Sequence, residues 1–318
     1  MPQPLSNVRP DPALSAIAQE LGAGPGFAVN ELAPARTVPA RSYKYGVWDL
    51  EHMLVQHESE TLAAPGTPAN RVRSPQLTWL TGLVNEHKLS AEITDVERGE
   101  SVNPASLERT RVQKITMELM QPIETYFRDL INDTSTIAHA SPAVKWDAST
   151  GTIVIEANID AAREVFIKQY RFEPTHIVLP PAVAQVAKRD STIRDLRKFT
   201  DPSLLIDGGL PSKLFGLNVV VPGALLNSAN PGAAASIARI WSADNAILLY
   251  VNPAAATDPS AMTAVTRVRC SYDRGFDIPI ERQRHPFESA KSDLYTGYVA
   301  WDMKLSAGCV YIIDDVLT

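Results

Sequence analysis

The chain has 318 residues, of which 45% are apolar and 21% are charged, as expected of a folded globular protein. Its 30 basic and 36 acidic residues give a formal net charge of -6. This charge argues against a protein that binds nucleic acid through a clustered basic face. The apolar runs are too short to span a bilayer and no secretory signal is visible, so we expect a cytoplasmic protein. Two distant cysteines, Cys270 and Cys309, predict neither a disulfide framework nor a zinc site.

The first segment, residues 1–41, is predicted to be an extended arm with one short helix. Seven of the 24 prolines fall within the first 40 residues, which excludes a long helix or a central strand. Asp11 suits the N-cap, Pro12 the first helical position and Gly22 the end of the helix. Its apolar face cannot be buried within the arm, so it must lie on the body of this chain or on a neighbouring subunit. That face carries Leu14, Ile17 and Leu21.

Residues 42–94 are predicted to form a long, protruding hairpin. Tyr43 and Tyr45 alternate with polar or small residues, and period two returns at residues 77–83, with turn residues at 64–69 between them. The limbs hold too few large apolar residues to fold alone. We therefore expect subunit contacts in this segment, with these candidates: Tyr43, Tyr45, Trp48, Pro65, Gly66, Arg71, Arg73 and Trp79.

A long helix is predicted over residues 104–132. Asn103 suits the N-cap and Pro104 the first turn, and apolar residues recur at steps of three and four from Leu107 to Ile131. About 28 residues at 1.5 Å per residue give roughly 42 Å. Such a helix needs a broad sheet or neighbouring subunits beside it.

Residues 151–255 alternate helix and strand, which predicts a compact α/β unit. Within it, 237–241 and 246–251 read as a hairpin around 242–245. Residues 256–318 return to strand, with predicted strands at 265–272, 276–283, 294–304 and 309–313.

The sequence motifs do not predict a catalytic, phosphate-binding or metal-binding site. Phosphate-binding glycine loops and the G-x-S-x-G nucleophile motif are absent from the sequence. His52 and His57 are five residues apart, which places them on different faces of a helix or of a strand. Their spacing therefore does not predict a metal site. We predict no catalytic, cofactor-binding or metal-binding residue, and an enzyme that acts through Asp207 or His176 stays as a less favoured alternative.

Five stretches, in order along the chain, resemble the major capsid protein of tailed bacteriophages, with its Hong Kong 97-like fold. They are 64–67 (Ala-Pro-Gly-Thr), 84–97, 174–183, 214–223 and 240–251. The resemblance implies an α+β fold with an N-terminal arm (1–41) and an extended hairpin, or E-loop (42–94). It also implies a peripheral domain (95–150 and 256–318) that carries the spine helix 104–132, and an axial α/β domain (151–255).

The same resemblance implies a shell protein without catalysis. Pentamers and hexamers would close into an icosahedral shell around a phage double-stranded DNA genome, contacted non-specifically. Scaffolding, portal and decoration proteins are the implied partners, no membrane is involved, and the virion is assembled in the host bacterial cytoplasm. The alternative is an encapsulin-like nanocompartment that packages an enzyme.

Two departures from the resembled family matter. Some members cross-link subunits through a lysine of the hairpin, but no lysine lies between Lys44 and Lys88, so we expect a non-covalent shell. Some begin with a long charged scaffolding segment that is removed, whereas the first 40 residues here are proline-rich and lack a coiled-coil pattern. A separate scaffolding protein, or none, is expected.

Overall fold

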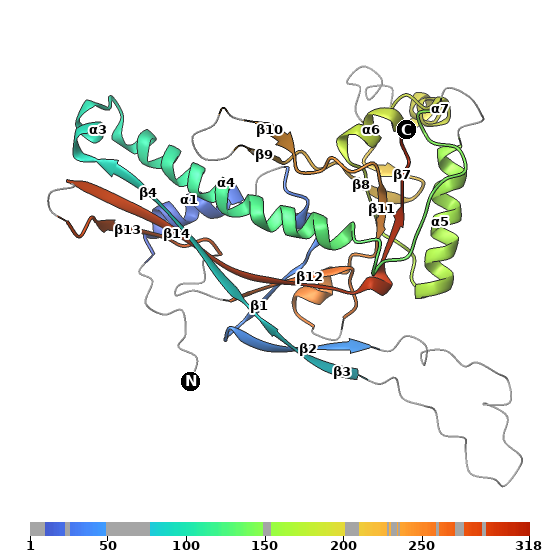
Figure 1. Ribbon diagram of the computed structural model, residues 1–318, viewed down its shortest axis with the longest axis horizontal. Coiled ribbons are helices and arrows are strands. Elements are labelled where there is room, and N and C mark those ends of the chain that lie inside the picture. The colour runs from blue at the N-terminus through green and yellow to red at the C-terminus, as the bar shows by residue number, and fades with distance from the viewer. Residues whose placement is uncertain are drawn as a thin grey trace, which may run out of the picture.

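In the described residues, the computed structural model has two large sheets, of five and six strands, linked by one long helix, and two two-stranded sheets (Figure 1). The residues described are 10–22, 26–48, 77–148, 154–200, 210–227, 229, 234, 236–258, 261–270, 277–287 and 291–318. The mixture of helix and strand confirms the predicted α+β class. Figure 1 shows the long helix α4 lying along strands β4 and β14, with the second sheet and helices α5 to α7 near its C-terminal end.

Helix α4 (Pro104–Ile131) begins as predicted and ends one residue earlier than predicted. The Oδ1 atom of Asn103 accepts a hydrogen bond from the Ser106 amide at 3.3 Å, so the cap is made. Its buried face contacts the first sheet, where a glycine permits close approach. A Cβ atom at Gly297 of β14 would lie 2.5 Å from Cγ2 of Ile115, so any larger residue there would push the helix away.

The first sheet has five strands, with β14 at its centre. β14 (Ser292–Leu305) pairs with β12 (Val265–Cys270), β13 (Ile280–Arg284) and β4 (Asn85–Thr94), all antiparallel, and β1 (Ala35–Val38) lies parallel to β12. All of β4 pairs with β14. The segment 85–94, which the sequence placed in the protruding hairpin, is therefore a strand of the body, followed by helix α3 (Asp95–Glu100).

The hairpin itself is formed by β2 (Ser42–Trp48) and β3 (Leu77–Leu83), paired antiparallel along seven residues each. Both limbs start where the alternation predicted them. Figure 1 shows the paired strands extending away from the first sheet. The predicted turn at 64–69 lies outside the described residues.

The arm folds onto its own chain. Helix α1 (Pro12–Gly22) has the predicted bounds, and Oδ1 of Asp11 accepts from the Ala13 amide at 3.0 Å. It contacts α4 and β13, and a second short helix, α2 (Val29–Leu32), also contacts α4. Of the two supports that the sequence left open for the apolar face of this helix, the structure shows the body of the same chain.

The second sheet has the order β5-β15-β11-β6-β8-β7. Its strands are β5 (His139–Ala140), β6 (His176–Val178), β7 (Lys213–Leu214), β8 (Leu217–Val220), β11 (Ala246–Leu249) and β15 (Val310–Ile313). Helices α5 (Ile155–Tyr170), α6 (Pro181–Ala187) and α7 (Ser191–Thr200) accompany it, as predicted. Short 3-10 helices cover 253–256 and 307–309.

One predicted pairing was wrong. β10 (Ile237–Arg239) does not pair with β11; it pairs antiparallel with β9 (Leu225–Asn227), while β11 lies between β15 and β6. The strand β11 is buried at every position, and a fully buried strand needs a partner on each side. The pairing of β15 and β5 with this sheet also means that an axial domain drawn as 151–255 omits two of its strands.

A buried carboxylate joins three segments of the core. Glu124 of α4 is fully buried; its Oε1 accepts from the Ala28 amide at 3.0 Å and from Trp241 Nε1 at 2.7 Å, and its Oε2 accepts from the Val29 amide at 3.0 Å. Burial raises the pKa of Glu124, and the three hydrogen bonds oppose that rise. The arm, the long helix and the segment before β11 therefore meet at one side chain.

Replacing this carboxylate by an amide tests the junction. In Glu124→Gln an NH2 group takes the place of one oxygen, so at least one buried N–H then faces a donor. We expect the free energy of unfolding to fall by about 1–3 kcal/mol, measured by urea denaturation of dispersed subunits. Glu118→Gln, on the same helix with an exposed side chain, is the matched control and is expected to change stability little. Equal stability of the two variants would contradict this assignment.

Candidate subunit interface

The two faces of the β2–β3 hairpin differ in what covers them. Directly opposed residues of an antiparallel pair point to the same face. Tyr43 lies opposite Gly82 and Tyr45 opposite Leu80, so these four share one face. The other face of β3 carries Trp79, Thr81 and Leu83.

The face that carries the tyrosines is anchored to the first sheet. The Tyr43 hydroxyl donates to Oδ2 of Asp302 at 2.8 Å, and Nζ of Lys304 lies 5.3 Å from the ring centroid of Tyr45. A Cβ atom at Gly82 would collide with the Tyr43 ring, so glycine makes room for it. Burial and then the bond to Asp302 raise the pKa of Tyr43. These contacts fix the base of the hairpin on its own chain.

The opposite face exposes two large apolar side chains beside the polar residues Lys44 and Thr81. Trp79 is 57% exposed and Leu83 is 59% exposed. Thr81 lies between them on the same face of β3. Two large apolar side chains exposed on the same face of one strand favour a surface that another molecule covers.

The predicted contact residues divide accordingly. Leu14 and Tyr43 are 8% and 7% exposed, so their own chain already covers them. Ile17 and Leu21 are partly buried, and Ile17 packs against the main core. Trp79 is exposed as an interface residue requires. Pro65, Gly66, Arg71 and Arg73 lie outside the described residues, and of Trp48 only the backbone is described.

Sequence reasoning missed a charged cluster at the opposite end of the first sheet. Asp293 of β14 accepts from Arg98 Nη2 at 2.8 Å, from Arg282 Nη2 at 2.8 Å and from Arg284 Nη1 at 3.1 Å. Arg284 also pairs with Asp95 of α3 at 2.5 Å. Arg284 lies directly opposite Asp293 in the β13–β14 register, a pairing that no local sequence signal reveals.

This cluster sets the ionisation of its central carboxylate. Burial opposes the ionisation of Asp293, but hydrogen bonds from the three arginines outweigh it and lower the pKa to about 2. The Tyr295 hydroxyl accepts from Arg98 at 3.1 Å and donates to Oε1 of Glu108 at 2.8 Å, which extends the network onto α4. The cluster thus ties α3 and α4 to one end of the sheet.

The reactive groups of the described residues are dispersed and shielded. No group of three His, Cys, Asp or Glu side chains in the described ranges could hold a metal ion. Burial raises the pKa of the Cys309 thiol to about 12 and lowers that of His176, whose Nδ1 lies 2.8 Å from Oγ1 of Thr175. Asp207 lies outside the described residues. None of the helices in the described ranges has the length and apolar character that a bilayer crossing needs.

Comparison with protein families gives a match to the family described as "Phage capsid protein", over residues 90–292. The match covers more than half of the chain. The chain belongs to this phage capsid family. No curated protein matches this capsid protein.

Solved structures share its fold along nearly the whole length. A phage-related protein from Bordetella bronchiseptica superposes with a TM-score of 0.70 at 15% identity, covering 98% of this chain and 99% of that one. The mature capsid of bacteriophage PhiM1 gives a TM-score of 0.56 at 11% identity, over 90% and 87%. The SrpI encapsulin of Synechococcus elongatus gives 0.50 at 12% identity, over 93% and 89%.

These findings confirm the resemblance seen in the sequence. The capsid protein has the Hong Kong 97-like fold, and its family indicates a structural role in a shell. At these identities the superpositions show the fold alone, and the encapsulin shares that fold.

The Asp293 cluster predicts a specific acid response of the subunit. Because the folded pKa of about 2 lies below the ordinary value of 3.8, the stabilisation is present above pH ~4 and lost as the pH falls toward 2. The difference corresponds to roughly 2 kcal/mol. In Asp293→Asn we expect this part of the pH dependence to disappear, and stability at pH 7 to drop.

Urea denaturation of dispersed subunits between pH 2.5 and pH 7 measures this response. Asp160→Asn, on the exposed side of α5, removes the same charge and is expected to keep the wild-type slope below pH 4. A wild-type slope in Asp293→Asn would contradict the role given to the cluster.

Proposed function

We propose that this capsid protein assembles through pentamers and hexamers into an icosahedral shell around the double-stranded DNA genome of a phage. The observation that carries the proposal is the exposure of Trp79 and Leu83 on the outer face of the hairpin, while the inner face is the one that carries Tyr43 and Tyr45. Trp79 and Leu83 stay exposed, although the inner face of the same two strands is anchored through Tyr43 and Asp302. Exposed apolar side chains on an anchored hairpin, with no cover among the described residues, fit a contact with a second copy.

The other parts of the proposal follow from the family. The predicted division into arm, E-loop, peripheral and axial domains is kept with two changes: β4 is assigned to the peripheral unit because it pairs with β14, and β5 and β15 to the axial unit because they pair within its sheet. Scaffolding, portal and decoration proteins are proposed partners. Host cytoplasm is the proposed place of assembly, and the shell is proposed to be held without covalent links.

The hairpin contact can be tested by removing its apolar atoms. Burying a Trp or Leu side chain contributes about 1.5–3 kcal/mol, so the double variant Trp79→Ser, Leu83→Ser should raise the concentration needed for assembly at least tenfold. Sedimentation velocity and negative-stain microscopy measure this. The variant subunit should unfold at the wild-type temperature, because both side chains are exposed in the free chain.

Val102→Ser removes an exposed apolar side chain from the loop just before the long helix and serves as the control. Assembly of the double variant at the wild-type concentration would refute the hairpin contact, and a wild-type protein that stays monomeric at high concentration would refute the shell.

The contents of purified particles separate the phage reading from the encapsulin alternative. We expect nuclease-protected double-stranded DNA from particles made during phage production, and a single subunit band on a denaturing gel. Particles that contain a co-purifying enzyme and no DNA would favour the nanocompartment.

A further inference from the structure

One edge of the first sheet is open along the strand β4. All ten residues of β4 pair with β14, and no other described strand pairs with it. A sheet edge presents a row of backbone N–H and C=O groups, so natural proteins shorten, bend or interrupt their edge strands. β4 contains neither proline nor glycine, and residues 87–90 are exposed. Another extended chain can therefore reach this edge.

The hydrogen bonds at the end of β4 show which backbone groups point outward. The Asp95 amide donates to the Lys291 carbonyl at 2.8 Å, so the odd-numbered residues of this segment direct their backbone groups to β14. The Thr94 amide points the other way and donates to Oε2 of Glu97 at 3.1 Å. The even-numbered residues therefore direct their N–H and C=O groups to the open edge. Along the exposed part of β4 these are Glu86, Lys88, Ser90 and Glu92.

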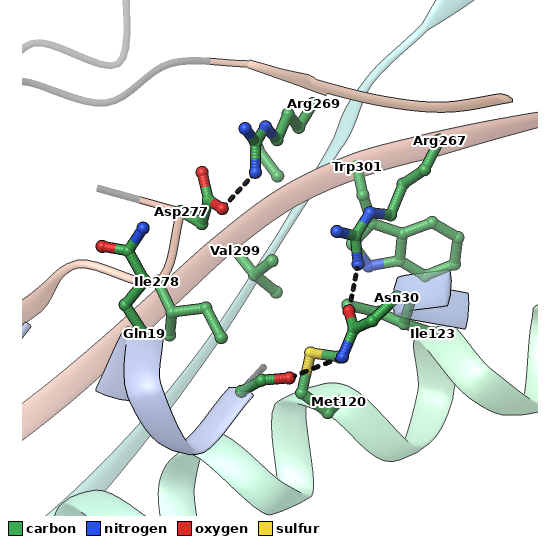
Figure 2. A pocket seen from close by; sticks show the side chains of 12 residues that line it. Gln19, Asn30, Met120, Ile123, Arg267, Arg269, Asp277, Ile278, Val299 and Trp301 are labelled. Carbon is green, nitrogen blue, oxygen red and sulfur yellow. Dashed lines mark hydrogen bonds and ion pairs between the residues drawn. The ribbon is translucent and has the colours of Figure 1, made fainter. Parts of the chain in front are cut away.

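The side chains of these even-numbered residues lie on the face of the sheet away from α4. Val299 and Trp301 of β14 line one cavity with Met120 of α4, so the odd-numbered residues of β14 face the helix (Figure 2). His87 lies opposite Val299 and shares that face. Alternation then places Lys88, and every second residue after it, on the other face.

The charges on that face suit a second copy of the same strand. Lys88 disfavours most partners at this edge, because only a strand that sets a carboxylate opposite it gains from its charge. Glu92 supplies such a carboxylate. Among the described residues only its Oε1 is engaged, by the Ser292 hydroxyl, which leaves Oε2 for a lysine.

One antiparallel register brings these two charges together. When Ser90 lies opposite Ser90 of the second copy, each Lys88 lies opposite a Glu92. Centring the pair on Leu89 sets Glu86 against Glu92, and centring it on Lys88 or on Glu92 sets two identical charges against each other. Like charges directly opposed destabilise a strand pair, so the register centred on Ser90 is favoured.

We propose that β4 pairs antiparallel with β4 of a second copy, centred on Ser90, which joins two first sheets across a two-fold axis. The pairs 88 with 92, 90 with 90 and 92 with 88 then exchange two hydrogen bonds each, and such a self-complementary contact closes on itself. Leu89, which is 38% exposed, gains Ala91 of the second copy as its neighbour. The inference rests on the proposed self-assembly and adds a contact that the hairpin does not make.

A cysteine at the axis tests the register. Directly opposed residues of a hydrogen-bonded pair have Cα atoms about 5.5 Å apart, which a disulfide can span. In Ser90→Cys we expect oxidation to link two subunits, both in particles and in concentrated dispersed subunits, as a dimer band on a non-reducing denaturing gel. Cys270 and Cys309 are buried, so the wild type should give no such band. Gln113→Cys, at an exposed position of α4, is the matched control and should give little dimer.

Exchanging the charges tests the pairing itself. In the Ser90→Cys background, Lys88→Glu or Glu92→Lys sets like charges against each other at two symmetric places, so cross-linking should slow roughly fivefold. The double exchange restores opposite charges and should recover the rate. Thermal unfolding checks that each variant subunit stays folded. Cross-linking that stays slow in a folded double exchange would contradict the register.

The edge pairing and the proposed shell can fail separately. Particles in which Ser90→Cys gives no dimer band would overturn the pairing and leave the shell in place. A dimer band from subunits that never assemble would support the pairing and refute the shell. A band that forms only when Trp79→Cys is added would assign the open edge to the hairpin of another copy and overturn the pairing of β4 with itself.

Discussion

The contact of α4 with β14 is the constraint on which the other contacts depend. Because Gly297 lets Ile115 approach the sheet closely, the helix lies low enough for its other sides to be covered by the arm and by Trp241. Glu124 then satisfies the backbone of the arm from within the core. A single helix therefore sets the positions of the two helices of the arm, the first sheet and the entry to the second.

The hairpin shows how a subunit can be stable and still incomplete. Its inner face is held by the Tyr43 hydroxyl, by the Lys304 ammonium group over the Tyr45 ring and by Gly82, which makes room for the Tyr43 ring, all within one chain. The outer face has no such support from the residues that the structure describes. Rigid positioning of an uncovered apolar surface lowers the entropy lost on association, because the strands need not be ordered at that moment.

Signals close together in the sequence predicted the helices and strands. The pairings between strands that lie far apart in the sequence could not be predicted. Caps such as Asp11 and Asn103 lie within a few residues of the helices they start, so both helices could be read directly. The pairing of β4 with β14 joins residues about 200 positions apart, and nothing near residue 85 indicates it. The charged cluster could not be foreseen for the same reason, since register brings Arg284 and Asp293 together.

The topology of the second sheet has a consequence for synthesis on the ribosome. β15 lies between β11 and β5, so residues 310–313 must emerge before β5 gains its partner and before β11 is covered on that side. Until then a strand made of Ala246, Ile247, Leu248 and Leu249 presents an open edge. A nascent chain that is halted shortly before residue 310 therefore exposes an apolar strand with an unpaired edge. We expect chaperones that recognise exposed apolar segments to bind it.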